Sequence, residues 1–179
     1  MAKIAIILGS IREGRLGEPV AEWVACQAVG RLAEYNLIDL KNSPLPLLDS
    51  AVVPGQANKQ YANSDVQKWA NKIDEFDGFI FVTPEYNHNV PGPFKNAFDS
   101  IAGEWKGKPL AVVAYGFGGG VDATAGWRKA TTGALQMQFV EETTNIAIPE
   151  NFKDGEFIPT DDVADQLIAT LDAIESKFA

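Results

Sequence analysis

Two arginines, Arg12 and Arg15, stand in the segment GSIREGRLG, Gly9–Gly17, between an apolar run and a helical pattern. Guanidinium groups pair with phosphate oxygens, and the free N–H groups at a helix N-terminus attract anions. Ser10 adds a hydroxyl. The glycines fit neither GxGxxG nor GxxxxGK[ST], which disfavours a dinucleotide fingerprint and an NTPase loop. The spacing predicts a phosphate-binding loop. The alternative is a solvated loop whose arginines pair with neighbouring glutamates.

A second segment, TPEYNHNVPGPFKN, Thr83–Asn96, combines three prolines with the aromatic residues Tyr86 and His88. The prolines stiffen the chain, so its backbone groups can read the polar edges of a flat ring while aromatic faces cover it. The segment predicts a wall of a ring-binding site. Alternatively, Tyr86 only covers the core, and His88 is an ordinary surface side chain instead of a general acid or base.

A third segment, YGFGGG, Tyr115–Gly120, has four glycines in five residues. Glycines let the backbone approach a ligand closely, with N–H groups that no side chain obstructs. The segment predicts a second close contact with a ligand. It is alternatively a flexible hinge before a helix for which Asp122 is the N-cap.

Apolar patterning predicts strands and helices that alternate along the whole chain. The helices have apolar residues at helical spacing, and we expect Ser64 and Thr160 to cap two of them. The expected strands are Lys3–Leu8, Asn36–Leu40, Gly78–Thr83, Pro109–Tyr115 and Val140–Ile148. The expected helices are Glu18–Ala33, Ser64–Phe76, Phe94–Gly103, Asp122–Leu135 and Thr160–Phe178.

Alternating strands and helices with no linker or repeat predict a single α/β domain over residues 1–179, a doubly wound parallel sheet with right-handed crossovers. Ligands bind such sheets beyond the carboxyl ends of the strands, where the strand order reverses. The three segments described above follow the first, third and fourth expected strands. We therefore expect them to meet at one ligand site.

Composition excludes several other classes of protein. The formal net charge of −9 at pH 7 disfavours general binding to nucleic acid or an anionic membrane. One cysteine and one histidine exclude an intramolecular disulfide and the Cys/His clusters of most zinc sites, so we expect no metal site. The N-terminal apolar run is too short for a signal peptide, which makes a cytoplasmic protein the expectation. We expect Cys26 on the buried face of the first helix.

Together, GSIREGR, TPEYNHNVPGPFKNAFD and WKGKPLAVVAYGFGGG resemble the NAD(P)H-dependent FMN reductase family. This flavodoxin-like group includes quinone, azo-dye and chromate reductases, and the resemblance extends over residues 3–150. It implies a flavodoxin-like five-stranded parallel sheet in the order 2-1-3-4-5, with helices on both faces and FMN at the switch between strands one and three.

The resemblance also implies the residues that bind FMN. The phosphate is expected at Ser10, Arg12, Arg15 and the loop amides up to Gly17. The isoalloxazine is expected against Pro84, Glu85, Tyr86 and Asn87, with Gly116, Gly118 and Gly119 at its other edge.

The implied reaction passes hydride from NADPH through FMN to a quinone, an azo dye, a flavin or a similar acceptor, in ping-pong fashion. The cofactor carries the chemistry, so we expect no catalytic side chain. Alternatives are a flavodoxin-like electron carrier and a flavin-binding regulatory protein.

The resemblance further implies a homodimer or homotetramer. Four aromatic residues are candidates for its interface anchors, with core packing as the alternative: Phe94, Phe98, Trp105 and Trp127.

Overall fold

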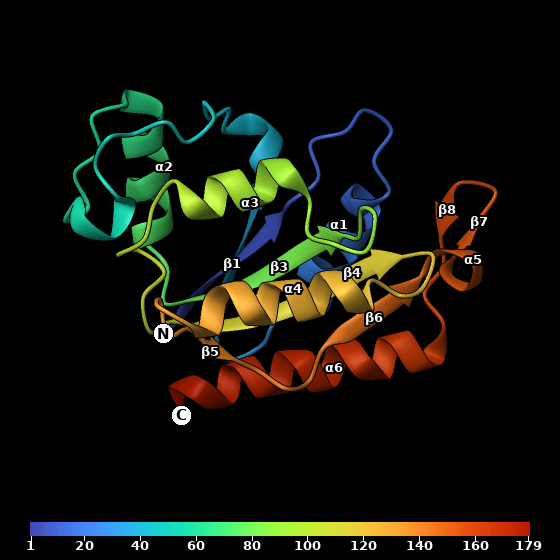
Figure 1. Ribbon diagram of the computed structural model, residues 1–179. Coiled ribbons are helices and arrows are strands. Elements are labelled where there is room, and N and C mark those ends of the chain that lie inside the picture. Colours follow the sequence, from blue (N-terminus) through green and yellow to red (C-terminus); the bar gives the residue numbers. More distant parts are fainter.

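A parallel sheet forms the centre of the computed structural model, which describes residues 1–179 (Figure 1). Its strands lie in the order β2-β1-β3-β4-β5, and β6 also pairs with β4. All of these pairings are parallel. The expected 2-1-3-4-5 order is therefore confirmed. The order reverses between β1 and β3, which are neighbours although β2 lies between them in the sequence.

The strands of the sheet are β1 (Lys3–Leu8), β2 (Glu34–Asp39), β3 (Gly78–Pro84), β4 (Pro109–Gly116), β5 (Gln138–Phe139) and β6 (Thr144–Ala147). The α-helices are α1 (Gly17–Gln27), α2 (Ser64–Asp74), α3 (Gly92–Asp99), α4 (Val121–Thr132), α5 (Ile148–Asn151) and α6 (Asp161–Glu175). A small hairpin is formed by β7 (Phe152–Lys153) and β8 (Glu156–Phe157), and short 3-10 turns are η1 (Leu40–Asn42), η2 (Pro54–Gln56) and η3 (Ser176–Phe178).

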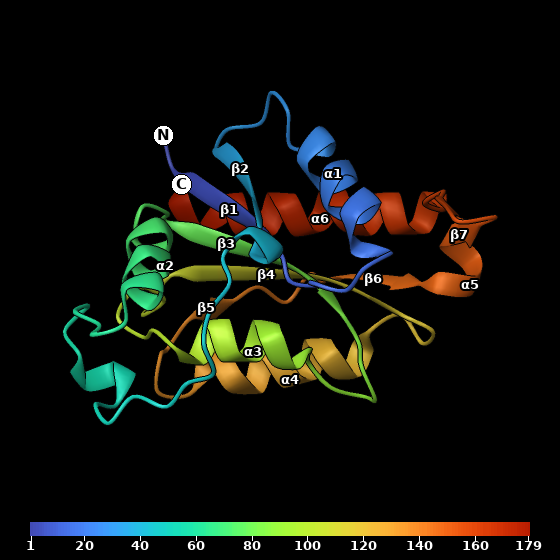
Figure 2. The same ribbon diagram turned by 90° about the horizontal axis from the view of Figure 1, so that it is seen from above.

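Helices cover both faces of the sheet, as Figure 2 shows along its edge. Alternate residues of a strand point to opposite faces, so each central strand feeds two cores. In β1, Ala5 and Ile7 join the core beneath α2, α3 and α4, while Ile4 and Ile6 join the core beneath α1 and α6. β3 and β4 are buried along their whole lengths. Their near-continuous apolar sequences reflect this burial on both faces.

The last extended segment differs from the expectation of one strand over Val140–Ile148. Two short strands replace it: β5 lies just before the expected range, and β6 lies inside it. β5 pairs with the start of β4 at Pro109 and Leu110, and β6 pairs with its end, from Val113 onward. After β5, Val140 N still donates to Leu110 O of β4 at 2.9 Å, and the register of β4 is taken up again only by β6.

The first helix ends at Gln27 and not at Ala33. Gly30 has a φ of +78°, a left-handed conformation that a continuing helix does not contain, and Leu32 is 83% exposed. The expectation that Cys26 is buried is also wrong, because this thiol is exposed. Residues Val20 and Val24 share the buried face, and Cys26 lies two residues, or about 200°, farther around the helix.

The capping predictions have mixed outcomes. Thr160 caps α6 as expected, accepting a hydrogen bond from Val163 N. The N-cap of α2 is Asn63 and not Ser64, because the Asn63 side chain accepts from the second and third helical N–H groups. The N-cap of α4 is Gly120, so Asp122 lies inside the first turn. Helices α2, α3 and α4 also end earlier than expected.

The four aromatic candidates for interface anchors belong to the core, and each is at most 2% exposed: Phe94, Phe98, Trp105 and Trp127. They surround Phe81 of β3, with ring centroids 4.7–6.2 Å from its ring. Core packing is thus the correct alternative for all four. The indole N–H of Trp127 donates to Thr83 Oγ1 at 3.1 Å, which fixes the end of β3 against α4.

None of the helices has the length and apolar character that a membrane crossing needs.

Candidate functional site

The three expected loops meet beyond the carboxyl ends of β1, β3 and β4, at the right of Figure 1. A cavity of about 240 Å³ lies between them. Seven of the eleven expected site residues line it: Ser10, Arg12, Arg15, Pro84, Glu85, Tyr86 and Gly116. Leu16, Tyr115, Phe117 and Ile148 complete the lining and were not expected. Tyr115 and Leu16 are adjacent in the sequence to expected residues. Ile148 is far from them in the sequence, so only the folded structure shows that it lines the cavity.

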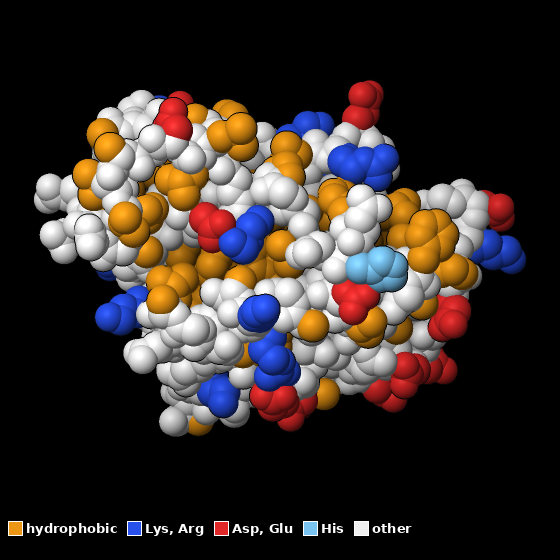
Figure 3. Space-filling model, in the orientation of Figure 1, with side chains coloured by type: hydrophobic (Ala, Val, Ile, Leu, Met, Phe, Trp, Pro, Cys, Tyr) orange, Lys and Arg blue, Asp and Glu red, His pale blue; other side chains and the backbone are white.

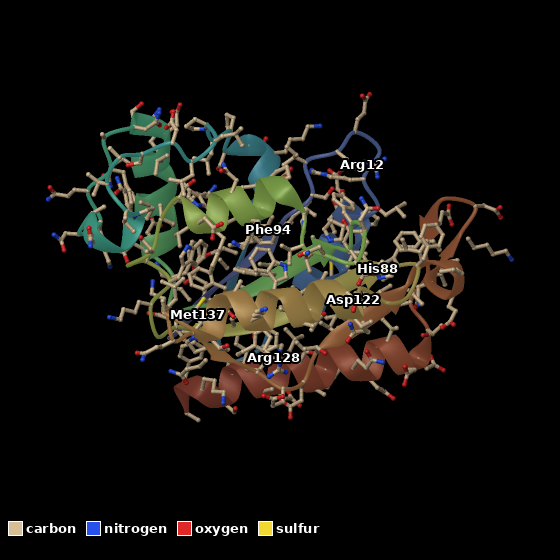
Figure 4. The ribbon with its side chains drawn as sticks, in the orientation of Figure 1. Arg12, His88, Phe94, Asp122, Arg128 and Met137 are labelled. Carbon is tan, nitrogen blue, oxygen red and sulfur yellow. The ribbon has the colours of Figure 1, made fainter.

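The first loop offers an unusual number of free donors. Gly9 N donates to Val82 O at 2.9 Å, which continues the β1–β3 ladder. None of the backbone N–H groups from Ser10 to Leu16 donates a hydrogen bond within the chain. Arg12 is exposed and forms no ion pair (Figure 4). The loop therefore has seven N–H donors and a guanidinium available to an anion.

Arg15 has protein partners instead. Its guanidinium donates to both carboxylate oxygens of Asp39, at 2.7 and 2.5 Å, and to Ser10 O at 2.7 Å. Its Nε lies 3.6 Å from a carboxylate oxygen of Glu18, and the side chain is only 5% exposed. The hydrogen bond to Asp39 raises the pKa of Arg15. Arg15 thus holds the loop against the end of β2 while it lines the cavity.

The hydroxyls of Ser10 and Tyr86 lie 3.0 Å apart and join the first loop to the second. Ser10 is buried, and Tyr86 is partly buried. Behind them, the buried Tyr115 hydroxyl has no hydrogen-bond partner. Burial raises the pKa of Tyr115, so this group remains a neutral hydroxyl. A buried hydroxyl without a partner costs stability unless a ligand or water satisfies it.

Gly17 begins α1 directly against this tyrosine. A Cβ added at Gly17 would lie 2.3 Å from the Tyr115 hydroxyl, closer than any real contact. Gly17 does not line the cavity itself. Because Gly17 has no side chain, the Tyr115 hydroxyl can pack directly beneath the first loop.

Glu85 links the second loop to α4. Its Oε2 accepts from Asp122 N at 2.9 Å and from Ala123 N at 3.2 Å, and its side chain is 11% exposed. A carboxylate at a helix N-terminus is stabilised by free N–H groups and by the helix dipole. Glu85 therefore supplies the cap that was expected from Asp122, and this capping holds its carboxylate at one edge of the cavity.

The remaining expected residues lie beside the cavity. Asn87, Gly118 and Gly119 are outside its lining. At Gly116, an added Cβ would lie 3.1 Å from Glu85 Cβ and 3.3 Å from Gly120 N, so the third loop passes close to the second. His88 is 83% exposed, and its Nδ1 lies 2.6 Å from Asp122 Oδ2.

A larger cavity of about 540 Å³ lies on the other side of Ile11, between the segment after β2 and the start of α3. Leu40, Leu45, Leu47 and Pro93 supply much of its apolar wall. None of the expected site residues lines it. In Figure 3 many apolar side chains are exposed at the upper left, where Figure 1 shows α2 and the chain that leads to it.

Comparison with known proteins identifies the family of the chain. Residues 2–149 match the family described as NADPH-dependent FMN reductase. An NAD(P)H-dependent FMN reductase of Schizosaccharomyces pombe is 36% identical over 152 residues, covering 83% of this chain and 74% of that protein. A quinone reductase of Pseudomonas putida is 33% identical over 116 residues, covering 62% of this chain and 58% of that protein.

Among solved structures, the flavoenzyme FerB, an NAD(P)H:(acceptor) oxidoreductase of Paracoccus denitrificans, aligns with a TM-score of 0.74. The alignment covers 98% of both chains at 26% identity. The enzymes of this family use FMN with NAD(P)H as the electron donor. With its flavodoxin-like strand order and its matching segments, the chain belongs to the NADPH-dependent FMN reductase family of oxidoreductases.

Proposed function

We propose that this protein passes hydride from NADPH through FMN to a quinone, with FMN held among the three loops. The observation that carries the proposal is the first loop, where seven backbone N–H groups and Arg12 have no partner in the chain. A phosphomonoester with about −1.5 to −2 charges at neutral pH complements such a set of donors.

The residues present fit the phosphate end of FMN, because the donors of the first loop have no partner in the chain. The Tyr115 hydroxyl beneath that loop is also unpartnered. The cavity volume of about 240 Å³ lies below the roughly 300–1,000 Å³ typical of ligand pockets. We therefore propose that FMN is partly enclosed, with one face of its ring left open.

Bound FMN supplies the hydride chemistry, which leaves the protein to bind, orient and tune it. Arg12 and the loop amides hold the phosphate, and Arg15 keeps that loop in place through Asp39. The second loop forms one wall of the ring site with Pro84, Glu85 and Tyr86, and Asn87 lies beside that wall. Gly116 lines the other edge, with Gly118 and Gly119 beside the cavity. A free backbone N–H group there, such as that of Gly118, would stabilise negative charge on a reduced ring.

The quinone acceptor is proposed from the quinone reductase of Pseudomonas putida. A flat nicotinamide and a flat oxidant would occupy the same space beside the second loop in turn, so we propose ping-pong kinetics. Azo dyes and flavins are further acceptors of the same shape. The residues around the cavity would orient donor and acceptor next to the cofactor, so no catalytic side chain is proposed.

The same fold also suits an electron carrier, and the acidity of the chain would suit docking to a basic partner. Anaerobic addition of NADPH to the FMN-loaded protein separates the two functions. Rapid bleaching of the flavin, followed by reoxidation with a quinone, supports the reductase. Bleaching that requires a separate reductase supports the carrier and contradicts the proposal.

We further propose that residues 1–179 act as one FMN-binding domain in a homodimer or homotetramer. The exposed apolar residues Leu47, Val52 and Val53 lie on the segment between β2 and α2, near the larger cavity. A second copy would remove them from water. Light scattering coupled to gel filtration measures the state directly, and a monomer would contradict this part of the proposal.

A further inference from the structure

Three side chains that bind metals meet where the second loop touches α4: Glu85, His88 and Asp122. Their ligand atoms all lie within 4.8 Å of one another. His88 Nδ1 lies 2.6 Å from Asp122 Oδ2 and 3.9 Å from Glu85 Oε1. Figure 4 shows His88 and Asp122 side by side, and in Figure 3 the single histidine lies over red carboxylate atoms at the surface.

Glu85 is the fixed member of the group. Its Oε2 is held by two backbone N–H groups of α4, which orients the whole carboxylate. Its Oε1 accepts no hydrogen bond and lies on the His88 side. The side chain as a whole is only 11% exposed. An oriented oxygen without a donor is suited to a cation, and the hydrogen bonds to Oε2 are of the kind that orients carboxylate ligands of metals.

His88 is held by a tight turn. Tyr86 and Asn89 exchange two backbone hydrogen bonds, at 3.0 and 3.1 Å, and the two residues between them have positive φ angles of 49° and 59°. The turn packs on α4, since a Cβ added at Gly126 would lie 3.1 Å from Val90 Cγ1. The turn therefore places the imidazole next to Asp122.

No Lys or Arg neutralises this group, because His88 is the only ion-pair partner of Glu85 and Asp122. With a neutral imidazole the three side chains carry two negative charges, which a divalent cation balances. His88 and Asp122 are 83% and 51% exposed, so water can complete a coordination shell.

We propose that Glu85 Oε1, His88 Nδ1 and Asp122 Oδ2 form a binding site for a divalent transition-metal ion, with Zn²⁺ as the probe. One imidazole and two carboxylates suit Zn²⁺, whereas Mg²⁺ prefers oxygen ligands alone. Ligand atoms around tetrahedral Zn²⁺ lie about 3.3 Å apart. The His88–Asp122 and His88–Glu85 separations of 2.6 and 3.9 Å lie on either side of that value, and no two of the three atoms are more than 4.8 Å apart. Side-chain rotations would have to bring the two carboxylates closer together around the ion.

The site would join the second loop to α4, and it shares Glu85 with the candidate FMN cavity. It differs from the zinc clusters that the sequence excludes, since it needs only one histidine. Glu85 lies three residues before the histidine, and Asp122 lies 34 residues after it. Only the folded chain brings Asp122 to the other two.

The test uses tag-free protein, stripped of metal with a chelator and kept in phosphate-free buffer. Calorimetry measures Zn²⁺ and Mg²⁺ binding, and Co²⁺ provides a visible spectrum that reports its ligands. We expect one Zn²⁺ per chain and no comparable binding of Mg²⁺. Both His88→Ala and Asp122→Asn should weaken Zn²⁺ binding at least tenfold, since each removes a direct ligand.

Asp154→Asn is the matched control for Asp122→Asn, because Asp154 is an exposed acid in the β7–β8 turn and belongs to no ion pair. It should leave Zn²⁺ affinity unchanged. Circular dichroism of each variant verifies its fold. Absence of saturable Zn²⁺ binding would overturn the proposal. So would binding that survives both His88→Ala and Asp122→Asn, which would place the ion elsewhere.

Discussion

Arg15 donates both Nη groups to the carboxylate of Asp39, 24 residues away, and so ties the first loop to the end of β2. The same guanidinium donates to Ser10 O, across the base of the loop. Planar guanidinium and carboxylate groups match in this paired geometry. The loop that presents free N–H groups is therefore anchored at its back, and its donors need little reorganisation to meet an anion.

Asp39→Asn should lower the free energy of unfolding by about 2 kcal/mol at pH 7, since charge-assisted hydrogen bonds contribute about 1.5–3 kcal/mol. Urea denaturation measures the change. Asp49→Asn is the matched control, because Asp49 is an exposed acid without an ion pair, and it should have almost no effect. Equal stability of the two variants would show that the Arg15 contact adds nothing.

The same pair predicts a pH dependence. Burial alone would raise the pKa of Asp39, but the hydrogen bonds from Arg15 and Lys41 N lower it below its ordinary value. A carboxyl group whose pKa is lower in the folded state stabilises the fold above its unfolded pKa of about 3.9. This stability is lost as the pH falls through the folded pKa. The difference between wild type and Asp39→Asn should be constant from pH 7 to about 5 and shrink below pH 4.

Arg12→Ala should weaken FMN binding about 10- to 150-fold, the equivalent of about 1.5–3 kcal/mol for a charged hydrogen bond. Quenching of flavin fluorescence on binding measures the affinity. Arg128→Ala is the control, because it removes the same charge from α4, where Arg128 forms an exposed ion pair with Glu141. It should leave the FMN affinity unchanged. If Arg12→Ala also binds FMN normally, Arg12 does not contact the phosphate.

Gly17→Ala should destabilise the protein by forcing the Tyr115 hydroxyl away from the start of α1, since overpacking costs about 1–3 kcal/mol. Tyr115→Phe removes that hydroxyl, which has no partner in the chain. In the FMN-free protein it should therefore be neutral or stabilising, and it should recover part of the loss in the double variant. Thermal unfolding of the wild type, the two single variants and the double variant completes this double-mutant cycle. If the two changes in stability simply add up, the Gly17–Tyr115 contact is contradicted.

Glu85→Ala should lower the free energy of unfolding by about 1–2 kcal/mol, because it removes the side-chain cap of α4. Glu156→Ala, an exposed acid in the β7–β8 hairpin, is the control. Denaturation with urea measures both variants. A loss no larger than that of the control would mean that the N–H groups of Asp122 and Ala123 do not depend on Glu85.

Much of this architecture follows from local sequence. The apolar runs of β1, β3 and β4 and the three loops after them were predictable, because buried parallel strands have continuous apolar sequences and glycines or prolines follow them. Thr160 was also predictable as a cap. The early end of α1 was missed because an apolar residue at helical spacing, Leu32, lies in a turn and contacts little of the core.

The contacts between the loops were beyond sequence reasoning. Arg15 looked like a second phosphate ligand, but its partner Asp39 ends another strand and becomes a neighbour only through the β1–β2 pairing. Glu85 was expected at the ring, yet its role as a cap depends on where α4 begins. Likewise, the unpartnered Tyr115 hydroxyl reflects its position under Gly17, which no local pattern contains.

The crystal structure of the complex with FMN tests the central claim most directly. The account predicts phosphate oxygens within hydrogen-bond distance of the N–H groups between Ser10 and Leu16 and of Arg12, with the ring against the segment from Pro84 to Asn87. FMN in the larger cavity beside Leu45, or a first loop whose N–H groups do not touch the phosphate, would contradict it.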